Sequence, residues 1–428
     1  MVAVVGAGPA GLAAAIELRR RGVAEVLVLE REAEPGGIPR HAQHQGFGLR
    51  DLRRAMSGPS YARRLAELAR RAGAEIRTET MVTGWSPVGP LELTSPRGRE
   101  TLSPAAVVLA TGCRERPRAA RLVPGSRPAG VMTTGMLQQL VYLRRQPVGE
   151  RALVVGAEHV SFSALLTLAH GGARCVGMTS ELERHQSLAA FRLGAAIRFR
   201  APLWTRTAVT AIRGHPRVEE VELTAVGSGR TRTVACDTVV FSADWIPDNE
   251  LAAMAQLDLD PLTRGPAVDA ALRTSRAGVF AAGNVLHGAE TADVAALSGR
   301  HAAAGVAAFL AAGGAAAAGV AAGDPAAGGP AAAGGPATDR VPIRCEHPLG
   351  WIAPNVVAAG AGAPARGHFA LRSRELLPRP ALEIAQGGRP LWRGRVRRLM
   401  PGRSTRVPHE WAAAVDPDAG PVAVRLRG

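Results

Sequence analysis

Apolar and polar positions follow a clear order in the first thirty residues of the chain. An apolar run at residues 2–5 is followed by a glycine-rich turn at 6–11, an Ala- and Leu-rich segment with helical spacing, and a second apolar run that ends at Glu30. Short apolar runs bounded by turns are typical of buried strands. The opening therefore predicts a strand, a tight turn, a helix and a strand, as in α/β proteins.

The same alternation continues along the chain. We expect a helix at residues 61–72 and strands at 75–77, 81–86, 91–94 and 106–110, then a second unit with strand 151–156, helix 161–170 and strand 174–178, a strand at 237–242, an apolar run at 277–282 and a helix from about residue 291. A repeated strand–turn–helix–strand unit indicates a doubly wound α/β fold in which a second dinucleotide-type unit is nested in the first.

The first turn, Gly6-Ala7-Gly8-Pro9-Ala10-Gly11, has the spacing of a dinucleotide-binding turn. Its first glycine permits the turn, its second lets the backbone approach a diphosphate, and its third lets the helix pack on the strand. The helix N-terminus offers unpaired N–H groups to the anion. Glu30, placed to accept ribose hydroxyls, favours FAD or NAD over the 2′-phosphate of NADP. The alternative is an ordinary strand–turn–helix with no ligand.

The second turn, Gly156-Ala157-Glu158-His159-Val160-Ser161, departs from this spacing, because Glu158 and Ser161 replace its second and third glycines. Glu158 brings a β-carbon and a negative charge to the place of the diphosphate, at a cost of roughly a few kcal/mol. This turn favours a platform for a substrate or a docking partner over a tight NAD(P) site, which stays as the alternative.

Length and composition narrow the classes of protein. A chain of 428 residues suggests two or three domains. The formal net charge of +16 would suggest nucleic acid as a partner. However, all 52 basic residues are Arg, dispersed over the chain without interleaved aromatics, so we expect no nucleic-acid binding. The absence of Lys excludes a Schiff-base mechanism.

Cysteine spacing and apolar stretches add further limits. Cys113, Cys175, Cys236 and Cys345 lie far apart, with no metal-ligand or disulfide spacing, so we expect no bound metal. With Met1 directly before the first strand, we expect a cytoplasmic protein. Residues 302–323 are uncharged but mostly Ala and Gly, so we expect no membrane insertion.

Taken in order, the motifs resemble the pyridine nucleotide-disulfide oxidoreductase family of flavoproteins, which carry two dinucleotide domains. The resemblance covers residues 1 to about 312 and rests on the first turn with Glu30, on Ala110-Thr111-Gly112 followed by Arg116-Pro117, on the second unit, and on the run Gly278–Asn284. It implies that the first unit binds FAD and that the second corresponds to an NAD(P) domain. Asn284 stands where the family has Asp.

The resemblance also implies boundaries and cofactor contacts. The predicted architecture is α/β, with an FAD-binding Rossmann-like domain (1–120 and 240–312), a nested NAD(P)-type Rossmann-like domain (121–239), an Ala/Gly/Pro linker (313–339) and a small, mostly β C-terminal appendage (340–428). The residues implied to contact FAD are Gly6, Gly8, Pro9, Ala10, Gly11, Glu30, Arg31, Gly37, Val82, Ala110, Thr111, Gly112, Gly283, Asn284, Thr291 and Ala292.

One departure from the family concerns redox chemistry. Members that reduce disulfides carry a Cys pair shortly after the Gly-Gly that corresponds to Gly36-Gly37, and residues 38–49 contain no Cys. We therefore expect no disulfide reductase activity. This segment looks like that of a subgroup of FAD-dependent oxidoreductases, some proposed to act beside glycerol-3-phosphate dehydrogenases. More distantly, the architecture is similar to the FAD subunits of heteromeric amine, opine or glycine dehydrogenases.

With FAD in the first unit, the chain after Gly37 is expected to pass the flavin ring. His44 and His41 are then candidates for proton exchange, and Arg40 for offsetting the charge of reduced flavin or binding a substrate carboxylate. Alternatively, the histidines only hydrogen-bond cofactor or loop carbonyls, and Arg40 is solvated. The helix that begins near Thr291 would direct its N-terminus at the flavin, with Glu290 or Asp293 capping it.

These observations predict an FAD-dependent oxidoreductase that transfers a hydride between flavin and a small organic substrate or NAD(P)H, without a redox disulfide. An alternative is an FAD-carrying subunit of a heteromeric amine, opine or glycerol-3-phosphate-type dehydrogenase, so the partner would be another subunit or a second copy of the chain. A third possibility is a flavin-binding scaffold or basic nucleic-acid binder without turnover.

Overall fold

The computed structural model describes residues 1–87, 89–187, 189–288, 290–314 and 340–427. The chain forms two compact units. The first contains Met1–Arg40, Gln45–Cys113 and Pro247–Gly428, and the second contains His41–His44 and Arg114–Ile246. Strands β10 (Cys113–Glu115) and β19 (Trp245–Pro247), where the chain passes from one unit to the other, pair with each other.

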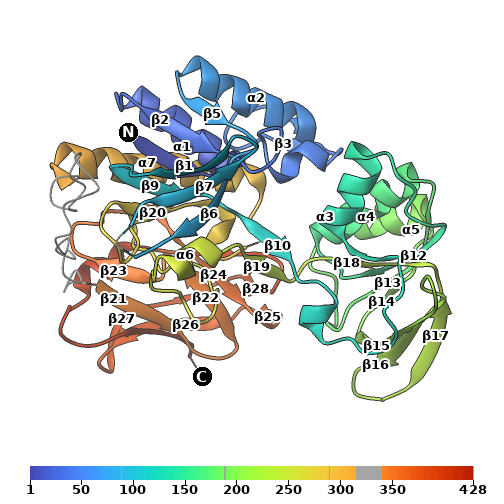
Figure 1. Ribbon diagram of the computed structural model, residues 1–428. Coiled ribbons are helices and arrows are strands. Elements are labelled where there is room, and N and C mark those ends of the chain that lie inside the picture. The colour runs from blue at the N-terminus through green and yellow to red at the C-terminus, as the bar shows by residue number, and fades with distance from the viewer. Residues whose placement is uncertain (88, 188, 289, 315–339, 428) are drawn as a thin grey trace. The chain divides into compact units, whose positions relative to one another are not determined.

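The first unit is built on a parallel five-stranded sheet of order β20-β9-β1-β2-β5 (Figure 1). Its strands are β1 (Val2–Val5), β2 (Val26–Leu29), β5 (Glu75–Arg77), β9 (Ala106–Leu109) and β20 (Val279–Ala281). Every residue of β1, β2, β9 and β20 is buried, which explains their continuous apolar runs. The strands predicted at 75–77 and 106–110 are confirmed.

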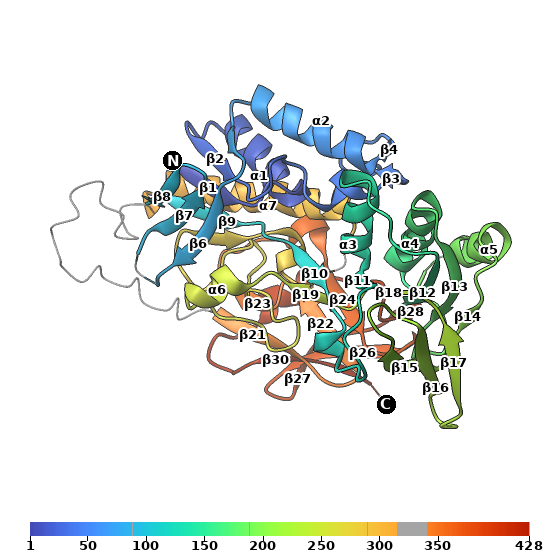
Figure 2. The ribbon, with the colours of Figure 1, turned by 45° about the vertical axis from the view of Figure 1, so that its right-hand side comes forward.

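Three helices flank this sheet: α1 (Pro9–Arg20), α2 (Gly58–Arg71) and α7 (Ala292–Ala311). Helix α7 lies along α1 in both views (Figures 1 and 2). Small residues allow this approach, because a β-carbon on Gly299 would lie 1.9 Å from the Ala10 carbonyl oxygen. Among the helices that the structure describes, α7 is long and apolar enough to cross a membrane, by length and composition only. Residues 315–323, part of the apolar Ala/Gly stretch, lie outside the described residues.

Shorter elements complete the dinucleotide-type part of the first unit. They are the antiparallel meander β6 (Met81–Trp85), β7 (Leu91–Ser95) and β8 (Gly98–Leu102), the pair β3 (Gln45–Phe47) and β4 (Met56–Ser57), and helix α6 (Glu250–Met254). The strands predicted at 81–86 and 91–94 match β6 and β7 to within one residue.

Residues 340–427 are mostly β, as expected, and belong to the first compact unit. Their strands are β21 (Arg340–Cys345), β22 (Leu349–Ala353), β23 (Val356–Ala358), β24 (Phe369–Ser373), β25 (Leu377–Pro378), β26 (Ala381–Gln386), β27 (Arg389–Arg395), β28 (Arg398–Leu399), β29 (Thr405–Val407) and β30 (Val422–Leu426).

A hydrogen bond connects this segment to the rest of the unit, because the Asn355 side chain accepts the Val268 N–H at 2.8 Å. We call residues 340–427 the C-terminal β segment. Residues 315–339, most of the predicted linker, lie outside the described residues.

The second unit has a parallel sheet of order β11-β18-β12-β13-β14. Its strands are β11 (Val131–Thr133), β12 (Arg151–Val155), β13 (Arg174–Thr179), β14 (Leu203–Trp204) and β18 (Thr238–Phe241), and its helices are α3 (Thr134–Gln138), α4 (His159–His170) and α5 (Ala189–Arg198). The antiparallel strands β15 (Thr207–Arg213), β16 (Glu220–Ala225) and β17 (Thr231–Ala235) lie on the side of this sheet opposite to α4 and α5 (Figure 2). The predicted nested α/β unit is confirmed.

Candidate functional site

The glycine turn between β1 and α1 forms an open cradle at the carboxyl edge of the first sheet. Gly8 is the N-cap residue of α1, no side chain caps the helix, and a β-carbon on Gly8 would meet nothing within 4 Å. The opposite wall is Gly37, where a β-carbon would lie 2.9 Å from the Gly8 Cα. Unpaired N–H groups at a helix start beside open space are suited to a diphosphate.

Gly6 and Gly11 keep this turn compact. Gly6 has a φ of +104°, and a β-carbon on it would lie 2.5 Å from the Ala110 carbonyl oxygen. A β-carbon on Gly11 would lie 1.9 Å from the Gly6 carbonyl oxygen. Side chains at either position would push α1 away from the sheet, so the predicted roles of these glycines agree with the geometry.

Glu30 lies at the end of β2 and is only 7% exposed. Its Oε2 accepts the Ala7 N–H at 2.9 Å and its Oε1 accepts the Glu32 N–H at 2.9 Å. These two bonds fix the carboxylate beside the glycine turn. Each oxygen keeps a lone pair for a ribose hydroxyl, so the position suits the predicted contact.

Ala110, Thr111 and Gly112 follow β9 at the same edge of the sheet. Gly112 has a φ of +81°, and a β-carbon on it would meet nothing within 4 Å. The Thr111 hydroxyl donates to the Asp248 carbonyl at 2.7 Å. The Arg31 side chain is 60% exposed, and its guanidinium lies 4.0 Å from the Asp248 carboxylate. Sequence reasoning missed Asp248, because no motif marks it. Val82, also predicted to contact FAD, is buried in β6.

The loop before α7 contains Gly283 and Asn284. The Asn284 amide donates to the Glu290 carbonyl and accepts the Glu290 N–H, both at 3.1 Å. The side chain therefore closes the loop, and its remaining hydrogen and lone pair stay for a ligand. Gly283 needs its φ of +78°, and a β-carbon there would lie 2.7 Å from the Ala10 Cβ.

Thr291 is the N-cap residue of α7, and Ala292 is its first residue. Asp293 is 5% exposed and accepts the Val294 N–H at 3.0 Å and the Arg50 N–H at 3.2 Å. The Arg50 guanidinium lies 3.5 Å from the same carboxylate. Asp293 thus lies inside the first turn and pairs with Arg50, a neighbour that the sequence did not indicate. The N-cap residue is Thr291, without a side-chain cap, so the cap predicted at Glu290 or Asp293 is not the one that the structure has.

The three candidate catalytic residues fall in different surroundings. Arg40 belongs to the first unit; its side chain is 14% exposed, with Nε 3.7 Å from Glu34. His41 and His44 belong to the second unit. His41 is 4% exposed, and its Nδ1 lies 3.1 Å from the Gln138 side-chain oxygen. His44 is half-buried, and its backbone N–H donates to the Ala42 carbonyl.

The second glycine turn differs from the first, because side chains of the turn cap α4, the helix that follows it. Glu158 is the N-cap residue of α4 and forms a capping box with Ser161. The Glu158 N–H donates to the Ser161 hydroxyl at 3.1 Å, and the Trp245 indole N–H donates to the Glu158 carboxylate at 3.4 Å. A carboxylate therefore holds the place that a nicotinamide dinucleotide diphosphate would need. The residues present do not fit that group.

All four cysteines are described, and all four are free thiols. Burial raises the pKa of Cys175 to about 12, that of Cys236 to about 11 and that of Cys345 to about 12. Because the thiolate is the nucleophilic form, burial disfavours the reactive state of these three groups.

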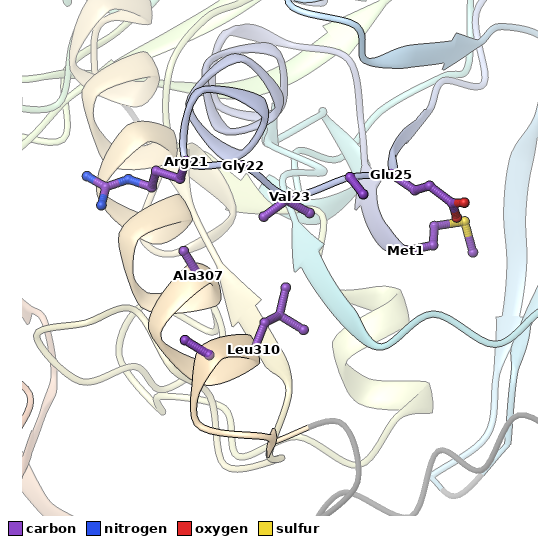
Figure 3. A pocket seen from close by; sticks show the side chains of 9 residues that line it. Met1, Arg21, Gly22, Val23, Glu25, Ala307 and Leu310 are labelled. Carbon is purple, nitrogen blue, oxygen red and sulfur yellow. The ribbon is translucent and has the colours of Figure 1, made fainter.

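A cavity of about 520 Å³ lies between the C-terminal ends of α1 and α7 (Figure 3). Its lining includes Met1, Val23, Glu25, Ala307 and Leu310. Met1 directly precedes β1 and Glu25 directly precedes β2, so the cavity lies at the amino edge of the sheet. Ligands of doubly wound folds bind at the carboxyl edge, so this cavity is not part of the candidate site.

Similarity to known proteins assigns the chain to a family. The family described as pyridine nucleotide-disulphide oxidoreductase matches residues 1–299. A thioredoxin reductase of Treponema pallidum is 28% identical over 293 residues, which cover 66% of this chain and 88% of that protein. A crystal structure of T. acidophilum thioredoxin reductase shares the fold, with a TM-score of 0.59, 21% identity, and coverage of 72% of this chain and 98% of that one.

A further relative is named as one subunit of an opine oxidase, from Agrobacterium tumefaciens, and is 32% identical over 337 residues. The match covers 70% of this chain but only 64% of that protein. The chain thus spans less than two thirds of this relative.

Proposed function

Because the chain belongs to the pyridine nucleotide-disulphide oxidoreductase family, it is an FAD-dependent oxidoreductase, and we propose that it transfers a hydride between flavin and a small organic substrate. The family uses FAD and NAD(P)H. The single observation that carries the proposal is the contrast between the two glycine turns: the first is open, and the second is filled by Glu158.

The first unit has the residues to hold FAD. The N-terminus of α1 with Gly8 and Gly37 would bind the diphosphate, and Glu30 would bind the ribose. Gly112, Asn284 and Thr291 line the same edge and are proposed to contact the rest of the cofactor. Bound FAD would supply the hydride-accepting chemistry that the side chains lack.

A redox disulfide has no part in the proposed reaction. The four cysteines form no pair, and burial keeps three of them protonated. On this proposal the chain differs in its chemistry from the relatives named thioredoxin reductase, although it shares their fold.

Electrons are proposed to come from the organic substrate rather than from NADH or NADPH. An approaching diphosphate would meet the Glu158 carboxylate and would have to break the capping box. The half-buried His44 is proposed to take up the substrate proton, and Arg40 to bind a negative charge, with His41 as a structural neighbour.

A second candidate function is that of an FAD-carrying subunit in a heteromeric dehydrogenase. It is supported by the similarity to the opine oxidase relative, whose name describes one subunit of a larger enzyme. A partner chain would then complete the substrate site or carry electrons onward.

Anaerobic flavin reduction tests the proposal. The purified chain is expected to be yellow and to be bleached by an amino acid, an opine or glycerol 3-phosphate, but not by NADH or NADPH. Rapid bleaching by NADPH would overturn the organic-substrate assignment, and a colourless protein that takes up no added FAD would overturn the flavin assignment. Bleaching only after a co-purified partner is added would favour the function as one subunit of a larger enzyme.

A further inference from the structure

The C-terminal β segment packs on the loop that leads into α7. The Ser404 hydroxyl donates to the Glu290 carboxylate at 2.5 Å. The His287 ring stacks on the Trp351 ring, with centroids 4.2 Å apart and planes at 23°. The short helix η5 (Ala365–Gly367) packs on α7 itself. Side chains of the C-terminal β segment are thereby brought to the start of α7, within the first unit.

Positive charges gather at this contact. Arg366 lies in η5, Arg406 lies in β29, and Arg50 reaches the N-cap Thr291 with a hydrogen bond of 3.0 Å. The charges of Arg406, Glu290, Arg50 and Asp293 all act on the Arg366 guanidinium. The Arg366 and Arg406 side chains are both exposed, so a dissolved ion can reach them.

The acids of this cluster already have partners. Asp293 accepts the Val294 N–H and pairs with Arg50, and Glu290 accepts the Ser404 hydroxyl. By contrast, neither Arg366 nor Arg406 forms an ion pair or a side-chain hydrogen bond with any residue that the structure describes. Partial burial, and next the charge of Arg406, lower the pKa of Arg366, whose side chain is still exposed.

His368 does not supply the missing partner. Its Nδ1 donates to the Arg366 carbonyl at 2.8 Å, so the imidazole holds the η5 backbone. Burial lowers the pKa of His368, and so do the charges of Arg366 and Arg406. An imidazole carries no negative charge in either protonation state, so the acids that act on Arg366 are Glu290 and Asp293, which have hydrogen-bond or ion-pair partners of their own.

We propose that Arg366 and Arg406 bind the oxyanion, a carboxylate or a phosphate, of this enzyme's substrate. Guanidinium groups bind both through paired N–H donors. In the β24–β29 pair Arg406 lies opposite Ala370, four residues after Arg366, and an anion bound there would offset the repulsion between the two charges. The inference rests on the proposed function in one respect: Thr291 and Ala292, at the start of α7, are proposed FAD contacts. The C-terminal β segment thus supplies the part of the substrate site that selects acids.

Solvated surface arginines are the alternative, and the chain offers a matched control. Arg389 and Arg395 are also exposed and lie on the edge strand β27 of the same segment. Replacing either pair by Gln removes the same charge from the same segment. A difference between the two double variants therefore reports position and not net charge.

Anion binding is measured on the full-length, FAD-loaded chain, so that the diphosphate cradle is filled. Thermal unfolding is followed while inorganic phosphate or acetate replaces chloride at constant ionic strength. For the wild type and R389Q/R395Q, the Tm is expected to rise with the anion concentration and to saturate. R366Q/R406Q is expected to bind the same anion roughly tenfold more weakly. The anion, phosphate or acetate, whose binding is weakened in R366Q/R406Q identifies the oxyanion. Equal responses of all three proteins would overturn the inference.

Reduction kinetics provide the second readout. With whichever substrate bleaches the wild type, R366Q/R406Q is expected to raise KM roughly tenfold and to leave kcat within about threefold, because the oxyanion is bound in ground and transition states alike. R366K/R406K, which keeps the charge, is expected to fall between the two. An unchanged KM would contradict the inference.

The two proposals fail separately. A wild type that takes up no FAD overturns the proposed function. The anion titration of the purified chain without FAD then still tests whether Arg366 and Arg406 bind an oxyanion. If the double variant fails to fold, R406Q alone gives the same comparison against R395Q.

Discussion

Gly299 of α7 lies so close to Ala10 of α1 that a β-carbon built on the glycine would come within 1.9 Å of the Ala10 carbonyl oxygen. Helix α1 carries the cradle on its first turn, so this contact sets the position of the proposed diphosphate site. G299A is expected to destabilise the chain by about 1–3 kcal/mol, because the helices must separate. Urea unfolding and the FAD content of the purified variant measure the effect.

The matched control is G194A. Gly194 lies inside α5, and a β-carbon there would meet nothing within 4 Å. This substitution is expected to be neutral or to stabilise by about 0.5–1 kcal/mol. A destabilisation equal to that of G299A would refute the packing argument.

Glu30 offers a direct test of the first nucleotide site. E30Q removes the charge that fixes the Ala7 N–H, and we expect FAD to bind roughly 10–100-fold more weakly, as for the loss of a charge-assisted hydrogen bond. Quenching of flavin fluorescence gives the Kd. E32Q is the control, because Glu32 is 54% exposed and its carboxylate is no closer than 3.9 Å to Arg31. An unchanged Kd for E30Q would place the ribose elsewhere.

Glu158 is expected to determine whether the second unit accepts a nicotinamide nucleotide. E158G removes the N-cap carboxylate and should raise the affinity for NADH or NADPH roughly tenfold or more, as for the removal of like-charge repulsion. Isothermal titration measures it. E150Q is the control, since Glu150 precedes β12 and is exposed. Tight NADPH binding by the wild type would show that the loop opens around Glu158.

His287 predicts part of the pH dependence of stability. Burial lowers the pKa of His287 below its usual 6.5. As the pH falls below about 6.5, the unfolded chain binds a proton that the folded chain does not, so the free energy of unfolding decreases. H287Q is expected to flatten this decrease. Urea unfolding between about pH 5 and 8 measures the slope, and because His185 and His368 are shifted in the same direction, some slope should remain.

Local sequence predicted most of the fold. The strands at 75–77 and 106–110 and the helix that begins near 291 are present because apolar runs and helical spacing report burial directly. The helix predicted at 161–170 begins two residues earlier, at His159, because Glu158 and Ser161 cap it together. The charge that disfavours a nucleotide there also stabilises the helix.

Long-range contacts were not predictable from local pattern. Arg50 and Asp293 are 243 positions apart in the sequence and have no motif that links them. The proximity of Arg366 and Arg406 to the start of α7 likewise depends on how the C-terminal β segment folds back on that helix. His41 is a candidate for proton exchange because it comes shortly after Gly37 in the sequence. Its hydrogen bond to Gln138 depends on tertiary packing, so the sequence does not indicate it.

Strand β20 and helix α7 come from residues 279–311, after the whole second unit. While the chain is being synthesised, β9 emerges with only one of its two neighbouring strands, β1, and α1 emerges before α7, which packs along it. The second unit, by contrast, is nearly continuous and complete by Ile246, so it can fold first on the ribosome. A nascent chain that stops before α7 therefore lacks the proposed FAD contacts at Thr291 and Ala292, although its diphosphate-binding turn has already been made.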